Sequence, residues 1–376
     1  MCILEDYPFQ NWSASDVADL SDALTQQVQD ARGSGVQLQI AGSGSRIGWL
    51  PRAQGAFQTI DLCGHTGILS YRPDELTLTA RAGTRLVEIE AALADRGQML
   101  AFEPPIFDPA GTLGGMVAAG LSGPSRPWLG AVRDSMLGIE MINGAGEYLR
   151  FGGQVMKNVA GYDVSRLQTG AWGTLGLLTA ITLRVHPIWP KQTTLVFNMQ
   201  AQAALAACAK IAGQAIPLTG TCWHEDKLYL RLGGSEGAVR GARTALVNEL
   251  SSAAPFGDQF WGDLRDHRLL FFDQPQSDWS STLWRVVTPP GAPLPTFLRG
   301  DDILPLLIEW GGGLRWLYHD DEAAVKAYAQ SVGGWCWALG HLLPTEAIQR
   351  RYMDRLRQAF DPEQVFCSPL DFTHGN

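Results

Sequence analysis

The segment that decides the fold occupies residues 108–120 and reads DPAGTLGGMVAAG. Thr112 stands where it can cap a helix whose first turn contains Gly114 and Gly115. A glycine inside a helix costs about 1 kcal/mol relative to alanine, so this pair needs a physical reason. One reason is a ligand: the first turn would leave its N–H groups open, and the helix dipole favours an anion there. The alternative reason is tight packing of the helix against its neighbours.

A second glycine-rich loop lies upstream, directly after a predicted strand over residues 36–40. Its members are Gly42, Ser43, Gly44, Ser45 and Arg46. Consecutive backbone N–H groups in such a loop can bind a diphosphate. A dinucleotide-binding fingerprint and an ordinary turn are the alternatives, but the fingerprint needs a following helix, which Pro51 and Gly55 would interrupt. Two such loops in one domain predict two sides of a single phosphate site.

Composition narrows the functional class. The chain has 376 residues, 45% hydrophobic and 18% charged, which is typical of a folded globular protein. Its formal net charge is −9 and no run of basic residues exceeds two, so nucleic acids and anionic membrane surfaces are poor partners. The six cysteines form no C-x-x-C pair and the seven histidines no H-x-H or H-x-x-H pair, so we expect no metal site.

The N-terminus has no basic region before an apolar stretch, and no run of about 18 apolar residues occurs anywhere. We therefore expect a cytoplasmic protein with neither a secretory signal nor a transmembrane segment.

The predicted elements indicate an α+β fold rather than a regular alternation of strand and helix. Strands flank an Asn-Gly-Ala-Gly turn at residues 143–146, which predicts a hairpin. Nine of the thirteen tryptophans lie from Trp189 onward, so a domain boundary is expected near residues 187–190. Beyond it, residues 310–316 and 333–337 are typical of two edge strands, whose aromatic side chains would form either a partner interface or a domain core.

Together these motifs resemble the FAD-binding domain of the vanillyl-alcohol oxidase/p-cresol methylhydroxylase (PCMH) superfamily. The resemblance rests on the two loops and on the stretches DELTL (residues 74–78) and AGT (residues 82–84). Residues 15–187 resemble more closely the GlcE family of bacterial glycolate oxidase subunits. That similarity is carried by GLSGP at 120–124, GAVRD at 130–134 and FGGQVMKNVAGYD at 151–163.

The resemblance implies a PCMH-type FAD-binding domain of two α+β subdomains at residues 1–187. A shortened α+β cap would follow at 188–355, and a C-terminal segment at 356–376 would return to the FAD domain. Relatives often end in Phe-Asn-Pro-Gly, whereas this chain has DPEQVF at 361–366 followed by Cys367.

The resemblance further implies non-covalent FAD, because the first loop offers neither the histidine nor the cysteine that covalent members use. The two loops would enclose the diphosphate, while other residues would lie along the flavin and ribityl chain or, for one strand backbone, near the adenine. The implied cofactor-binding residues are Gly42, Ser43, Gly44, Ser45, Arg46, Thr112, Gly114, Gly115 at the diphosphate; Ser122, Gly173, Gly176, Leu177 along the flavin; and Ile181 near the adenine.

At the level of function, the resemblance implies an FAD-dependent oxidoreductase acting on CH–OH groups as one subunit of a glycolate oxidase that forms glyoxylate. A GlcD-like flavoprotein would carry the substrate site and a GlcF-like iron–sulfur subunit would pass electrons on, at the inner face of the membrane through the complex. No catalytic acid or base stands out: residues 265–268 (RDHR) either bind an acidic substrate or form a solvated charged turn. A stand-alone hydroxy-acid oxidoreductase and a flavin-free scaffold are the alternatives.

Overall fold

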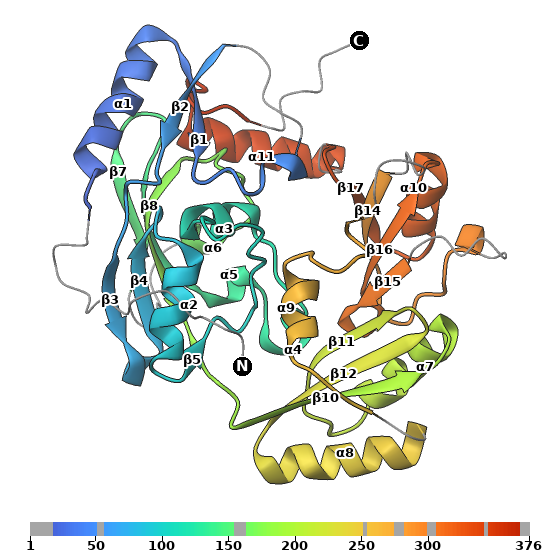
Figure 1. The fold of residues 1–376 in the computed structure, drawn as a ribbon. Coiled ribbons are helices and arrows are strands. Elements are labelled where there is room, and N and C mark those ends of the chain that lie inside the picture. Colours follow the sequence, from blue (N-terminus) through green and yellow to red (C-terminus); the bar gives the residue numbers. More distant parts are fainter. Residues whose placement is uncertain are drawn as a thin grey trace. The chain divides into compact units, whose positions relative to one another are not determined.

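The computed structural model describes residues 18–50, 56–153, 163–250, 254–273, 282–298, 306–341 and 345–368. These residues form two compact units, each built of helices and sheets (Figure 1). The first unit comprises the described residues within Met1–Ser122, Gly130–Ile188 and Thr345–Asn376, and the second those within Gly123–Leu129 and Trp189–Pro344. The predicted α+β fold class is confirmed. The GQVMKNVAGY part of the stretch at 151–163 lies largely outside the described residues.

The first unit is built on a five-stranded antiparallel sheet. Its strands, in spatial order, are β3 (Ile68–Arg72), β4 (Thr77–Arg81), β8 (Leu177–Arg184), β6 (Met136–Ile142) and β7 (Tyr148–Gly152). The predicted hairpin joins β6 to β7, and the Asn143 side chain closes its turn by accepting the N–H groups of Ala145 and Glu147. Strands β4 and β8 lie inside the sheet, and apart from Arg81 and Arg184 at their last positions their residues are apolar or threonine on both faces.

Smaller elements surround this sheet. They are the parallel pair β1 (Gln37–Ala41) and β2 (Phe57–Asp61), the pair β5 (Gln98–Met99) and β9 (His186–Pro187), and the helices α1 (Ser21–Ser34), α2 (Leu86–Ala94), α3 (Leu113–Ala119), α5 (Val132–Ser135) and α6 (Val164–Leu167), with 3-10 turns η2 (Ile47–Trp49) and η3 (Pro73–Glu75). Leu24 and Val28 of α1 are buried in the unit's apolar core, together with Leu86, Ile89 and Leu93 of α2. The i, i+3/i+4 spacing of these residues gives each helix one apolar face.

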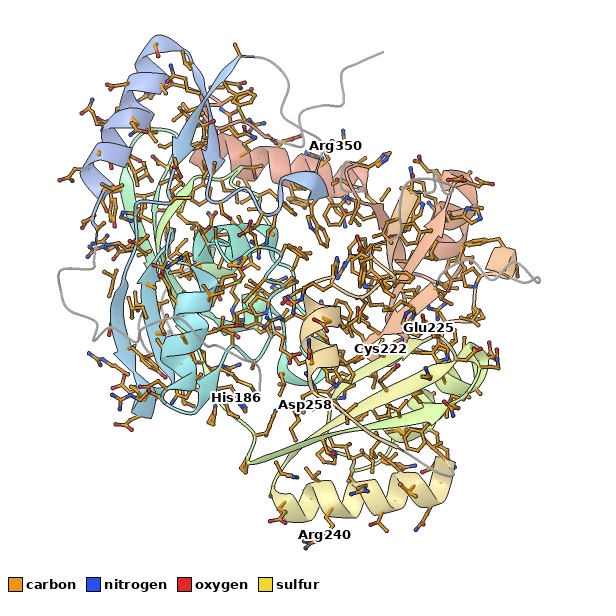
Figure 2. All side chains as sticks on the ribbon, viewed as in Figure 1. His186, Cys222, Glu225, Arg240, Asp258 and Arg350 are labelled. Atoms are coloured by element: carbon orange, nitrogen blue, oxygen red, sulfur yellow. The ribbon has the colours of Figure 1, made fainter. Side chains whose placement is uncertain are left out.

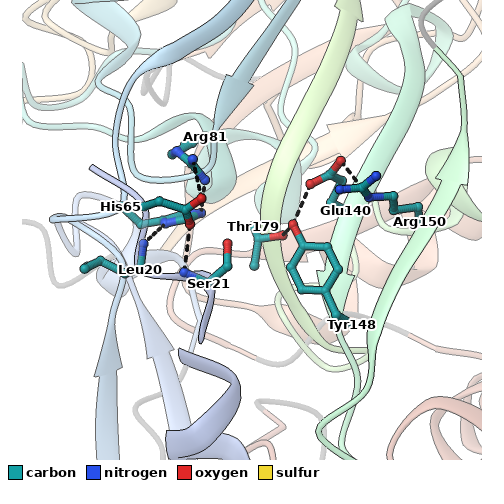
Figure 3. Close-up of polar contacts among 9 residues, drawn as sticks. Leu20, Ser21, His65, Arg81, Glu140, Tyr148, Arg150 and Thr179 are labelled. Atoms are coloured by element: carbon teal, nitrogen blue, oxygen red, sulfur yellow. Dashed lines mark hydrogen bonds and ion pairs between the residues drawn. The ribbon is translucent and has the colours of Figure 1, made fainter. Parts of the chain in front are cut away.

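A polar network fixes the start of α1 to this unit (Figure 3). The backbone N–H of Leu20 donates to His65 Nδ1 at 3.0 Å, and the carboxylate of Asp19 pairs with Arg81 at 2.7 Å. A second part of the network runs from Thr179 through the Tyr148 hydroxyl to Glu140. His65 is fully buried, and burial followed by the nearby Arg81 charge lowers its pKa. The imidazole therefore stays neutral and acts as an acceptor.

The C-terminal part of the described chain packs in the first unit. Helix α11 (Ala347–Phe360) leads into a segment that adds to β1: Leu38 N–H donates to Val365 O at 2.7 Å, and Cys367 N–H donates to Leu38 O at 2.8 Å. Phe366 between them is fully buried. The division into units thus places residues 345–355 with the first unit, whereas the cap implied by the family resemblance included them.

The second unit is built on an eight-stranded antiparallel sheet. Its strands, in spatial order, are β13 (Ala254–Phe256), β10 (Lys191–Asn198), β12 (Lys227–Gly234), β11 (Leu218–His224), β15 (Leu306–Glu309), β16 (Leu314–His319), β14 (Thr282–Val287) and β17 (Trp335–Ala338). Helices α7 (Ala201–Ala212), α8 (Glu236–Leu250) and α10 (Glu322–Ser331) contribute to an apolar core on one face. The remaining helical pieces are α4 (Arg126–Leu129), α9 (Gln259–Arg265), η4 (Thr296–Leu298) and η5 (Trp310–Gly312).

The structure corrects the prediction of two edge strands. Strand β16 is internal, with β15 on one side and β14 on the other, so of the two predicted strands β17 alone lies at an edge of the described sheet. Trp310, Trp316 and Trp337 are buried, whereas Trp335 is 43% exposed. The first three are therefore part of the domain interior, because a sheet of this width needs large side chains to fill its faces.

Candidate functional site

The two glycine-rich loops meet in the first unit. A Cβ added to Gly42 would lie 2.5 Å from Thr112 Oγ1, so only glycine fits at this position. A Cβ added to Gly111 would lie 3.6 Å from Ser45 Oγ and 3.8 Å from Arg46 Nη1. The loops that the sequence predicted to form two sides of one site are therefore neighbours in the fold.

The first loop presents backbone donors. Gly44 adopts a left-handed conformation (φ 74°), which glycine reaches without steric cost. Among the described residues, no protein acceptor takes the N–H groups of Ser43 and Gly44, while that of Ser45 makes only a long contact of 3.4 Å to Ser43 Oγ. Such a group of free N–H donors fits an anion like a diphosphate.

The second loop differs from its prediction in one respect. Thr112 caps α3 as expected, its hydroxyl accepting Gly115 N–H at 3.2 Å. The N–H of Gly114, however, donates to Ala82 O at 2.7 Å, and the N–H of Leu113 donates to a backbone oxygen of the same stretch of chain, which follows β4. These N–H groups of the first turn are therefore not available to a ligand. The reason is that α3 docks end-on against the chain leaving β4.

The Gly114–Gly115 pair has two separate causes. A Cβ on Gly114 would lie 2.9 Å from Ala82 Cβ, so tight packing requires this glycine. A Cβ on Gly115 would lie 3.2 Å from Thr112 Oγ1 and 3.7 Å from Arg46 Nη1, so this glycine faces the first loop. Gly115 is the member of the pair whose lack of a side chain leaves the site accessible.

Arg46 supplies the positive charge of the site. Its side chain is 8% exposed, with Nη2 donating to Pro105 O at 2.7 Å and Nη1 to Ser45 Oγ at 3.2 Å. The guanidinium also lies 5.6 Å from the centre of the Phe107 ring. Pro105 and Phe107, just before the segment 108–120, were not expected from the sequence to take part in the site. They orient Arg46 between the two loops.

A third segment approaches the first loop. Gly173 is left-handed (φ 77°), and a Cβ there would lie 3.3 Å from the Ile40 side chain, two residues before Gly42. The preceding Trp172 donates its N–H to Ala118 O of α3 at 3.0 Å, which holds the segment in place. Gly173 thus joins the residues that the fold brings together.

The remaining predicted residues have structural contacts of their own. Ser122 Oγ accepts Val132 N–H at 3.2 Å, and a side chain on Gly176 would collide with Met141. The side chains of Leu177 and Ile181 are fully buried in β8. For these four positions, a role at the cofactor stays a prediction.

Cys63 and His65, the cysteine and the histidine nearest to the first loop in the sequence, are poor candidates for a covalent flavin link. Burial and the Asp61 carboxylate raise the pKa of the Cys63 thiol to about 11, so it is protonated at neutral pH. His65 accepts a backbone N–H at Nδ1, and its Nε2 lies 3.5 Å from Arg81. Both ring nitrogens of His65 therefore face partners within the fold.

The charged segment at residues 265–268 is not a solvated turn. Asp266 is 6% exposed and pairs with Arg265 at 2.7 Å and with Arg268 at 2.6 Å. His267 is also buried, and burial followed by the Arg285 charge lowers its pKa to about 3. Both arginines already have a carboxylate partner. They are therefore poor candidates for holding an acidic substrate.

The described residues lack two other kinds of feature. They contain no group of three or more His, Cys, Asp or Glu side chains arranged to hold a metal ion. None of their helices combines the length and the apolar composition needed to cross a bilayer.

Comparison with known proteins settles the family. The chain is 43% identical over 353 residues to glycolate oxidase subunit GlcE of Escherichia coli, covering 93% of this chain and 96% of that protein. The chain belongs to the GlcE family. Residues 15–152 match the family described as FAD binding domain. Glycolate oxidase subunit GlcD of Bacillus subtilis is 31% identical over 196 residues, 46% of this chain and 40% of GlcD.

The fold agrees with this assignment. Alkyldihydroxyacetonephosphate synthase superposes with a TM-score of 0.66 at 18% identity, over 92% of this chain and 75% of that one. The predicted PCMH-type architecture is confirmed, as are FAD as the cofactor and the class of FAD-dependent oxidoreductase. The free N–H groups, the cleared Gly115 position and the buried Arg46 all fit a bound diphosphate.

Proposed function

We propose that this chain is the FAD-binding subunit of a multi-subunit glycolate oxidase, which oxidises glycolate to glyoxylate. The observation that carries the proposal is the meeting of the two glycine loops at Gly42 and Thr112, in a chain similar along 93% of its length to a glycolate oxidase subunit. Bound FAD supplies the hydride acceptor for oxidation of a CH–OH group.

Different residues of the two glycine-rich loops contribute to cofactor binding in different ways. The N–H groups of Ser43 and Gly44 would donate to the diphosphate, and Arg46 would offset its negative charge. Gly115 lets the backbone approach without a side chain between them. The binding is non-covalent, because the Cys63 thiol is protonated and the ring nitrogens of His65 have partners.

Partner subunits complete the reaction. The five described cysteines form no disulfide, and within the described residues they belong to no group of side chains that could hold a metal ion, so we place the iron–sulfur centre elsewhere in the complex. Onward electron transfer therefore falls to a GlcF-like partner, and a GlcD-like flavoprotein carries the main site of glycolate oxidation. The complex works in the cytoplasm, at the inner face of the membrane.

The test compares the purified chain alone with the chain co-purified with GlcD-like and GlcF-like subunits, using anaerobic glycolate and an artificial electron acceptor. We expect the chain alone to retain FAD that glycolate does not bleach, and the complex to reduce the acceptor. A complex lacking this chain, or containing the Gly115→Asp variant, should be impaired. Bleaching in the chain alone would favour a stand-alone oxidoreductase, and a fully active complex in which this chain holds no flavin would favour a scaffold.

A further inference from the structure

Helix α11 exposes apolar side chains that a surface helix ordinarily buries. Ile348 is 63% exposed and Tyr352, one turn further along, is 60% exposed, while Met353 beside it is 37% exposed. The helices α1, α7, α8 and α10 each bury two or more apolar side chains, whereas α11 buries none completely. Its packing against the apolar core comes from Phe360 at its last position. Ile348 and Tyr352 therefore form an open apolar stripe.

Exposed arginines border this stripe. Arg351 is three residues from Ile348, and Arg355 is three residues from Tyr352, so each lies beside an apolar member of the stripe. Arg350, labelled on this helix in Figure 2, is exposed as well. Within the described part of the chain, no hydrogen bond or ion pair reaches these three guanidinium groups.

Several exposed arginines elsewhere in the first unit have carboxylate partners. Arg32 pairs with Glu363, and Arg166 pairs with Asp163 at 3.1 Å. Helix α11 instead contains four arginines and a single aspartate, a formal charge of +3 in a chain whose net charge is −9. Like charges four residues apart destabilise a helix slightly, so this arrangement does not serve the stability of the helix itself.

The helix is joined to the strand that carries the first glycine-rich loop. The carboxylate of Asp361, directly after α11, accepts the N–H groups of Val365 and Phe366 at 2.8 and 2.9 Å. The segment fixed in this way pairs with Leu38 of β1, four residues before Gly42. A protein bound to α11 would thus contact an element that is connected by hydrogen bonds to the FAD-binding loop.

The size and the charge of this face select among possible occupants. A bilayer needs a continuous apolar face along a helix, whereas this stripe has two members. A symmetric contact between two copies of the chain would place the same arginines against each other. A protein surface that combines an apolar depression with carboxylates complements both features of the helix.

We propose that the exposed face of α11 binds the GlcF-like iron–sulfur subunit of the oxidase. Charge favours this partner, because a cluster ligated by cysteine thiolates carries a net negative charge. Ile348 and Tyr352 are the apolar anchors, and Arg351 and Arg355 pair with carboxylates around them. The inference rests on the proposed function for the presence of such a subunit in the complex.

The test measures the affinity of the full chain for the purified GlcF-like subunit and, separately, for the GlcD-like subunit. Ile348→Asp should weaken binding of the GlcF-like subunit by about 10-fold or more, because it places a charge where an apolar anchor was. The double variant Arg351→Glu/Arg355→Glu should weaken it by about 10-fold or more and remove most of its dependence on salt. Binding of the GlcD-like subunit should not change in either variant.

Helix α8 offers a matched control. Arg240, also labelled in Figure 2, and Arg243 are exposed there, but the apolar residues of α8 are buried, so no apolar stripe accompanies them. Arg240→Glu/Arg243→Glu makes the same change in net charge and should bind the GlcF-like subunit as the wild type does. Leu69→Asp, at an apolar side chain that is 41% exposed on β3, is the control for Ile348→Asp.

Melting temperature and flavin content of each variant chain alone are read from the same preparations and should match the wild type. Four results would overturn the proposal: unchanged affinity in both α11 variants, an equal loss in the α8 control, a loss of the GlcD-like subunit instead, or a lowered melting temperature of Ile348→Asp alone, which would show that the chain itself covers this face. If the wild-type chain assembles with both subunits and the α11 variants do so equally well, this inference fails and the proposed function stands. A wild-type chain that binds neither subunit contradicts both.

Discussion

Gly42 lies so close to Thr112 that a single methyl group on Gly42 would come within 2.5 Å of the threonine hydroxyl. The same hydroxyl caps α3 by accepting Gly115 N–H. One contact therefore couples the first loop, the second loop and the start of the helix. Loss of this contact should disturb cofactor binding and stability together.

We expect Gly42→Ala to lose most of its flavin and to lower the free energy of unfolding by about 1–3 kcal/mol, because the new methyl group must displace Thr112. Thr112→Ala alone removes the cap, at about 1 kcal/mol. The double variant removes the hydroxyl that the methyl group would meet, so its loss should be smaller than the sum of the two. Urea denaturation of all four proteins measures this, and strict additivity would show that the two residues are not in contact.

Gly115→Asp should abolish flavin retention without unfolding the chain. The new carboxylate would stand beside Arg46, since a Cβ at this position is 3.7 Å from Nη1, and would take the place of the diphosphate charge. Flavin absorbance measures the retained cofactor, and circular dichroism measures whether the chain remains folded. Gly33→Asp, whose Cβ would meet no atom within 4 Å, is the control and should retain flavin. Undiminished flavin in Gly115→Asp would remove the second loop from the site.

Acid should destabilise the first unit through His65. Because its pKa is lowered in the folded state, the unfolded chain binds the proton more readily. The contribution of His65 is complete above its unfolded pKa, about 6.5, and is lost as the pH falls below that value toward the folded pKa. Denaturation midpoints at two pH values on either side of 6.5 should differ less in His65→Gln than in the wild type. An unchanged difference, matching that of the exposed His341→Gln control, would contradict this role.

Phe366→Ala should destabilise the first unit by about 3–5 kcal/mol, because the ring is fully buried between two backbone hydrogen bonds to Leu38. Glu363→Gln nearby removes an ion pair with Arg32 in which both side chains are about half exposed, and should have no measurable effect. Thermal unfolding distinguishes the two. Equal effects would mean that the C-terminal segment is held by surface charge rather than by burial.

The sequence predicted local features best where the chemistry of a single residue type determines them. The Asn143 turn, the Thr112 cap and the adjacency of the two loops all follow from glycine and capping chemistry. It was less informative about features that depend on residues distant in the chain. The acceptor that closes Gly114 N–H is a carbonyl 32 positions away, at Ala82, and no local pattern indicates it. Neither could spacing show that β16 is internal, since strand order depends on long-range pairing.

The arginines of the second unit illustrate the same limit. The charged residues at 265–268 stand out in the sequence because they are adjacent in the chain, and the structure pairs both arginines there with Asp266. Arg285 has no charged neighbour in the chain, and the tryptophans around it come from three other segments. These ring contacts become visible only when the strands are aligned.

The central claim is that this chain binds FAD non-covalently at its two glycine-rich loops. The most direct measurement is the absorbance spectrum of the purified chain, followed by acid precipitation and quantification of flavin in the supernatant and the pellet. We predict FAD equimolar with the chain, all of it released into the supernatant, and little or none in the Gly115→Asp variant. A wild-type chain that remains colourless after reconstitution with FAD, or flavin that stays with the precipitated protein, would contradict the account.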